Sequence, residues 1–138
     1  ATQTLAALVD STTTDFTTPV NITTAWDVHP AQTGSVSLVA WFADPAAALV
    51  SGTDVIPSSM LSGRMSTGLV PAFTAFSGTA VGSTGVAGGT LELMRETIAG
   101  ANRQVTRTDN LELRIDLTGQ DVNPGSYSGT LILKAITQ

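Results

Sequence analysis

Side chains that could act as acids, bases or nucleophiles are few in this chain and widely spaced. There is one histidine, His29, which precedes Pro30 in an expected turn, and there is no cysteine. A serine hydrolase needs a base beside its nucleophile, and a zinc site needs several histidine or cysteine ligands. The stretch Gly125–Gly129 has Tyr127 where a nucleophile elbow carries serine. We therefore expect no enzyme, no metal site and no cofactor.

Two pairs of carboxylates have the spacing of neighbours on one face of a strand. The first pair is Glu92 and Glu96. The second pair is Glu112 and Asp116, with Arg114 between them. General acid catalysis by a carboxyl group requires an apolar pocket that raises its pKa. These residues instead alternate with apolar ones and have arginines nearby, so cross-strand ion pairing is the better interpretation.

The charge of the chain excludes some classes of partner. It has a net charge of −5, only six basic residues in 138, and 12% charged residues in total. No basic stripe could neutralise a phosphate backbone, so we expect no nucleic-acid binding. Arg95, Arg103 and Arg107 form the one local basic cluster, which we interpret as a solvated loop. No apolar run is long enough for a membrane span, and the opening residues ATQT fit a mature secreted chain after signal-peptide cleavage.

Hydrophobic residues alternate with polar ones along several segments, which is the pattern of β-strands. One face of a first strand carries Val20, Ile22, Thr24, Trp26 and Val28. The segment 35–42 is apolar on both faces, and Leu111–Leu117 alternates with charged residues. The last strand is expected over Tyr127–Thr137. Short links between these strands predict an all-β, immunoglobulin-like antiparallel sandwich.

Three other segments carry weaker patterns. Asp44 followed by Pro45 predicts one short helical turn. The segment Thr90–Ile98 fits both a strand and a helix, and we favour the strand. Residues 57–90 are rich in Gly, Ser, Thr and Ala and predict short strands joined by loops.

The end of the chain resembles a known family. Chaperone–usher pilins and spore-coat-U-like secreted domains end in a strand with the pattern P-x-G-x-Y-x-(D/G)-T-(V/L)-x-(V/L). Here the similar residues are Pro124, Gly125, Tyr127, Gly129, Thr130, Leu131 and Leu133, with the glycine one place early. The longer stretch 101–135 is similar to uncharacterised secreted β-sandwich proteins of environmental bacteria. The resemblance covers the last third of the chain and implies a sandwich that lacks its final strand, filled in pilins by an extension of the next subunit. The pilin cysteine pair is absent.

The other end of the chain has the pattern of such an extension. Leu5, Ala7 and Val9 alternate with Ala6 and Leu8, and the polar STTTD follows. We therefore divide the chain into an N-terminal extension, residues 1–15, and a sandwich domain, residues 16–138.

These observations support two hypotheses for the function. In the first, the protein is a secreted structural subunit of an extracellular filament, and each copy donates its N-terminal strand to the next. The donor residues are Leu5, Ala7 and Val9, and the acceptor groove is lined by Tyr127, Leu131, Leu133 and Ala135. Its partners are copies of itself and an assembly chaperone.

In the second hypothesis, the domain is a self-contained binding module such as an adhesin, a carbohydrate-binding domain or a phage decoration protein. Trp26, Trp41 and Tyr127 would then stack on a sugar. The N-terminal strand would in that case fold back on its own sandwich or remain unused.

Overall fold

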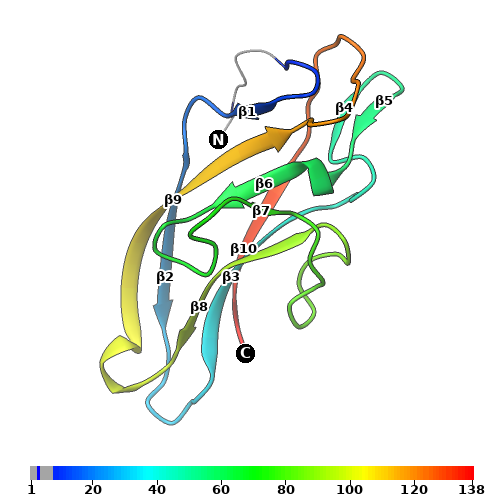
Figure 1. Cartoon of the computed structure of the whole chain (residues 1–138). Helices are drawn as coiled ribbons and strands as arrows, with labels where there is room; N and C mark the ends of the chain where they lie inside the picture. The colour runs from blue at the N-terminus through cyan, green and yellow to red at the C-terminus, as the bar shows by residue number, and fades with distance from the viewer. Residues whose placement is uncertain (1–2, 4–7) are drawn as a thin grey trace.

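The computed structural model describes residue 3 and residues 8–138, and these form an all-β sandwich (Figure 1). The strands are β1 (Thr13–Asp15), β2 (Val20–Asp27), β3 (Ser35–Phe42), β4 (Leu49–Ser51), β5 (Asp54–Ile56), β6 (Leu61–Arg64), β7 (Thr74–Ala75), β8 (Thr90–Thr97), β9 (Gln104–Asp116) and β10 (Leu131–Thr137). Two short 3-10 helices, η1 (Ser58–Met60) and η2 (Gly100–Asn102), lie between them. None of the helices in this part of the chain is long and apolar enough to cross a bilayer.

Two antiparallel sheets form the layers. The first has the order β1-β9-β6-β7, and β2 also pairs with β9. Strand β9 is long enough to pair with β2 through Gln104–Leu111 and with β1 through Arg114–Asp116. The second sheet has the order β10-β3-β8, and β4 and β5 form a separate hairpin. This antiparallel arrangement agrees with the immunoglobulin-like sandwich that the strand pattern predicts.

Alternation along the strands builds the core between the sheets. On β2, Ile22 and Thr24 are buried, whereas Asn21 and Thr23 are exposed. On β9, Leu111, Leu113 and Ile115 are buried in the same way. Phe42 of β3 meets Phe76 edge to face, with ring centroids 5.1 Å apart. The faces assigned from the sequence are therefore confirmed for β2, for the second half of β9 and for β3, whose Val36–Ala40 are all buried.

Two of three local expectations need correction. Asp44 accepts a hydrogen bond from the backbone N–H of Ala46, but the segment forms a turn and no helix. Thr90–Thr97 is a strand, as favoured. The expected loop around Arg107 is instead the first half of β9, and Arg107 lies on its inner face.

The final strand begins at Leu131, four residues later than expected, because the link before it is held against the β4–β5 hairpin. Val50 and Ser128 exchange two backbone hydrogen bonds of 2.8 and 3.0 Å. A Cβ on Gly129 would lie 2.0 Å from the carbonyl oxygen of Ala48, so only glycine fits there. The hydroxyl of Tyr127 donates to the carbonyl of Asn123 at 2.9 Å. A tyrosine that bonds back to the backbone a few residues upstream also occurs at a strand corner of immunoglobulin-like domains.

Candidate functional site: the free edge of β10

Strand β10 has a neighbour on one side only. It pairs with β3 in a regular antiparallel register from Leu131–Phe42 to Thr137–Val36. No strand of the described residues pairs with its other edge. An unpaired edge is a template for a further strand. The candidate site is therefore this edge together with the side chains that point inward from it.

The register tells which backbone groups face the free edge. Ser35 and Gln138 exchange both backbone hydrogen bonds, each of 2.9 Å. Hydrogen-bonded and non-hydrogen-bonded pairs alternate along an antiparallel ladder. The N–H and C=O groups of Leu131, Leu133, Ala135 and Thr137 must therefore point away from β3. This gives the free edge four alternate residues able to pair with an added strand.

The side chains of the same four residues point toward the core and are incompletely covered. Leu131 and Leu133 pack against the core but remain half-buried, and Ala135 is exposed. Their partners on β3, among them Ala40 and Leu38, are fully buried. The sandwich is thus incomplete along β10, whereas the opposite edge of the same sheet, at β8, is covered by loop residues. There, Leu69 donates to the carbonyl of Leu93 of β8 at 2.8 Å, and Gly78 donates to that of Thr90 at 2.9 Å.

The residues expected to form the acceptor groove fall in two places. Leu131, Leu133 and Ala135 lie on β10, as expected. Tyr127 precedes the strand, and its hydroxyl is used in the corner described above. Tyr127 therefore fixes the start of β10.

The donor residues lie mostly outside the part of the chain that the structure describes. Leu5 and Ala7 belong to residues 4–7, of which nothing is described. Val9 is 54% exposed, whereas its neighbour Leu8 packs against the core. Residues 13–15, which we assigned to the extension, form β1 and pair with β9.

Residues 9–12 are held at the end of the molecule where β10 begins. Leu117 donates to the carbonyl of Thr12 at 2.9 Å, and Ser11 donates to that of Gln120. The carboxylate of Asp10 accepts from the backbone N–H of Val122 at 3.1 Å. Residues 9–12 are therefore fixed at the upper end of the molecule in Figure 1.

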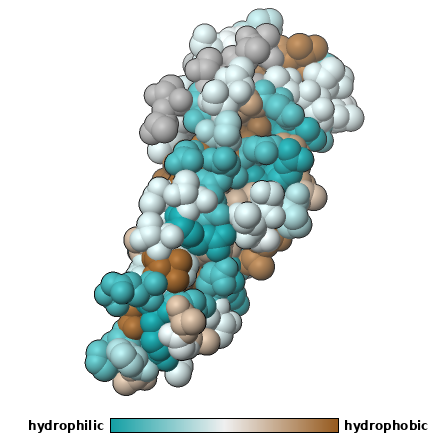
Figure 2. Space-filling model, turned by 90° about the vertical axis from the view of Figure 1, so that its left-hand side faces the viewer, coloured by the Kyte–Doolittle hydropathy of each residue, from teal (hydrophilic) through white to brown (hydrophobic). Residues whose placement is uncertain are grey.

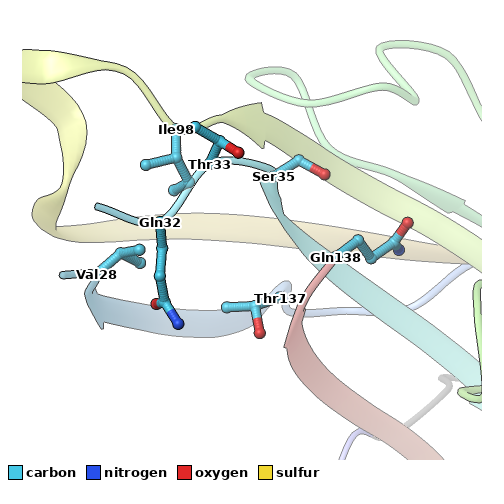
Figure 3. A pocket seen from close by; sticks show the side chains of 7 residues that line it. All are labelled: Val28, Gln32, Thr33, Ser35, Ile98, Thr137 and Gln138. Atoms are coloured by element: carbon cyan, nitrogen blue, oxygen red, sulfur yellow. The ribbon is translucent and has the colours of Figure 1, made fainter. Parts of the chain in front are cut away.

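The opposite end of the molecule contains a pocket, shown in Figure 3. It has a volume of about 300 Å³ and is lined by Val28, Gln32, Thr33, Ser35, Ile98, Thr137 and Gln138. Val28 and Ile98 are nearly buried and supply apolar lining. Arg103 fixes the loop beside it by donating to the carbonyls of His29 and Gln32, at 2.9 and 2.7 Å. The pocket lies where β10 ends.

The residues considered as candidates for catalysis or metal binding have structural partners. A ring nitrogen of His29 accepts from the backbone N–H of Ala31 at 3.2 Å, which stabilises the turn. Glu112 pairs with Arg64 across β9 and β6, as expected for cross-strand ion pairing. Within the described residues, no three His, Cys, Asp or Glu side chains are grouped to hold a metal ion.

An ionic network that the sequence analysis missed closes the sandwich between β8 and β9. Asp109 accepts two hydrogen bonds of 2.7 Å from Arg107 and one of 2.5 Å from Thr67, and its side chain is 2% exposed. Arg107 also donates to Glu96 of β8 at 2.9 Å. The hydrogen bonds from Arg107 lower the pKa of Asp109, against the opposing effect of burial. Alternation along β9 did not predict this network, because both charged residues lie on the face that is otherwise apolar.

The three aromatic residues considered for glycan stacking differ in their surroundings. The indole N–H of Trp26 donates to the carbonyl of Asn102 at 2.8 Å, and Tyr127 holds its corner. Trp41 lies half-buried on the outer face of the second sheet, next to Ile132 of β10. Two of the three thus have structural roles, which weakens the sugar-binding hypothesis.

Comparisons with known proteins found no relative. No protein-family model matches the chain, no curated protein matches it, and no solved structure matches it.

Proposed function

We propose that the protein is a structural subunit of an extracellular filament, and that the free edge of β10 receives the N-terminal strand of another copy. The observation that carries this proposal is the incomplete burial of Leu131, Leu133 and Ala135 beside an unpaired strand edge. An added strand would pair with the outward backbone groups and cover these side chains. Contact between two different surfaces of identical subunits propagates when it does not close into a ring.

The pattern of the N-terminal segment supplies the donor. In an added strand, Leu5, Ala7 and Val9 would lie on one face, which suits an edge whose inward side chains are apolar. The resemblance of the last strand to pilins agrees with this mechanism. Export to the cell surface, and an assembly chaperone that covers the edge before assembly, belong to the same proposal.

Leu5→Asp is the first variant that tests the proposal. A carboxylate at this position would be buried against the apolar side chains of β10, so assembly should fall below detection while the domain stays folded. Thr4→Asp is the control, since alternation places residue 4 on the opposite face of the donor strand. Light scattering and negative-stain electron microscopy on the same samples would read out the filaments. Filaments of Leu5→Asp equal to those of the control would contradict the proposal.

A further inference from the structure

The pocket where β10 ends is bounded by three segments of the chain that backbone contacts hold together. The N–H of Ile98 donates to the carbonyl of Gly34 at 2.8 Å, and Ser35 and Gln138 exchange two hydrogen bonds. A Cβ on Gly34 would lie 2.0 Å from the carbonyl oxygen of Gln138, so the segments approach this closely only because residue 34 is glycine. Arg103 fixes the adjoining loop through two backbone carbonyls. The pocket is therefore preformed.

Polar side chains from these segments gather around the pocket (Figure 3). The amide of Gln32 and the hydroxyls of Thr33, Ser35 and Thr137 form no hydrogen bond with any described residue. The side-chain amide of Gln138 forms a single long one of 3.5 Å. Amides and hydroxyls both donate and accept hydrogen bonds. These groups are therefore available to a ligand.

The remaining lining of the pocket is apolar. Val28 is 9% exposed and Ile98 is 7% exposed, and both belong to the core. The surface around this lower end of the molecule is mostly hydrophilic with small apolar patches (Figure 2). None of the three aromatic residues considered for glycan stacking lines the pocket. The pocket thus offers two aliphatic side chains surrounded by hydrogen-bonding groups.

The charges near the pocket offset each other. No ionisable side chain of the described residues lines it. Arg103 lies on one side and donates to the carbonyls of His29 and Gln32. Asp27, which precedes Val28, accepts a hydrogen bond from the side-chain amide of Gln104 at 3.2 Å. Because one positive and one negative group lie beside the pocket, neither an anion nor a cation would find a net counter-charge there.

We propose that this pocket binds an uncharged ligand with several hydroxyl groups, of the size of a single sugar ring. An apolar ligand would cover the polar groups of the rim without pairing them, and a charged ligand would lose its water without gaining an ion pair. The hydroxyls of a sugar ring pair with the amides and hydroxyls of the rim, while its C–H groups pack on Val28 and Ile98. The volume of about 300 Å³ lies at the lower limit of small-molecule sites, which suits one ring.

The pocket is complete within one copy, so sugar binding is independent of strand donation. Each copy would carry a sugar site at its lower end, whether it is a monomer or part of a filament. A filament built by strand donation would then present one such site per subunit. Loss of sugar binding and loss of assembly are therefore separate results.

Saturation-transfer difference NMR tests the proposal, because it detects weak ligands on monomers and filaments alike. The full chain would be mixed with a panel of neutral hexoses, pentoses, N-acetylhexosamines and myo-inositol. Glucuronate and N-acetylalanine methylamide are the comparisons, since the first adds a charge and the second has peptide groups without hydroxyls. We expect binding of at least one neutral member, about fivefold or more above both comparisons. No binding across the panel, or equal binding of either comparison, would overturn the proposal.

Thr33→Val combined with Gln32→Leu tests whether the sugar uses this pocket. Each change removes a hydrogen-bonding group with little change in volume, so the double variant should bind about tenfold more weakly. Both residues are exposed, and Gln32 bonds to Arg103 through its backbone carbonyl, so the fold should be retained, which thermal unfolding checks. Thr53→Val is the matched control, because Thr53 is exposed in the β4–β5 turn at the other end. Unchanged sugar binding by the double variant would refute this pocket as the site.

Discussion

Asp109→Asn should lower the free energy of unfolding by about 3 kcal/mol. The carboxylate is buried and accepts three hydrogen bonds, and its removal leaves the half-buried guanidinium of Arg107 without its main counter-charge. Arg107 retains Glu96, which keeps the loss at the lower end of what a broken buried ion pair costs. Chemical denaturation at pH 7 measures the change.

The control for this variant is Asp15→Asn. Asp15 pairs with Arg114 at 2.5 Å, but its side chain is 56% exposed, so the expected loss is below about 1 kcal/mol. Equal losses in the two variants would show that the network around Asp109 contributes no more than a surface pair.

The same network should make stability depend on pH in the acid range. The pKa of Asp109 is lowered in the folded protein, so its contribution is fully present above the ordinary aspartate pKa of 3.8. That contribution is lost as pH falls through the lower folded value. The difference in unfolding free energy between wild type and Asp109→Asn should therefore shrink below pH 4. A difference that stayed constant to pH 2 would contradict this assignment.

Ala135→Pro should abolish assembly and leave the domain folded. The N–H of Ala135 faces the free edge, so proline removes a donor that β3 does not use. Ile136→Pro is the matched opposite case. By the alternation from the Ser35–Gln138 pair, the N–H of Ile136 points toward β3, so its loss should destabilise the fold by about 3 kcal/mol or more. Thermal unfolding and light scattering would be measured on both.

The two proline variants separate edge pairing from general stability. If Ala135→Pro formed filaments at the wild-type concentration, β10 would not be the edge that pairs with another copy. If instead Ala135→Pro were as unstable as Ile136→Pro, the assigned direction of the β10 backbone groups would be wrong.

Strand positions and faces could be predicted from the sequence, because period-two alternation depends on local side-chain direction. The face of Ile22 and that of Leu113 were correct for this reason. The start of β10 could not be predicted, since it depends on the contact of Gly129 with Ala48 far away in the chain. Arg107 and Asp109 were misread because pairing lets charged residues occupy an inner face.

The candidate site could likewise be predicted only in part. Leu131, Leu133 and Ala135 were placed on one inward face from the sequence alone. That this face lies at a sheet edge depends on strand order, which alternation does not encode. The pocket where β10 ends is formed by three separate segments of the chain, so no single stretch of the sequence could predict it.

Amide hydrogen exchange along β10 tests the central claim most directly. In the monomer, the amides of Leu133 and Ala135 should exchange much faster than those of Lys134 and Ile136, which pair with β3. In the assembled protein all four should be protected, because the added strand pairs with the outward groups. Assembled protein in which Leu133 and Ala135 still exchange at the monomer rate would show that no strand is added to this edge.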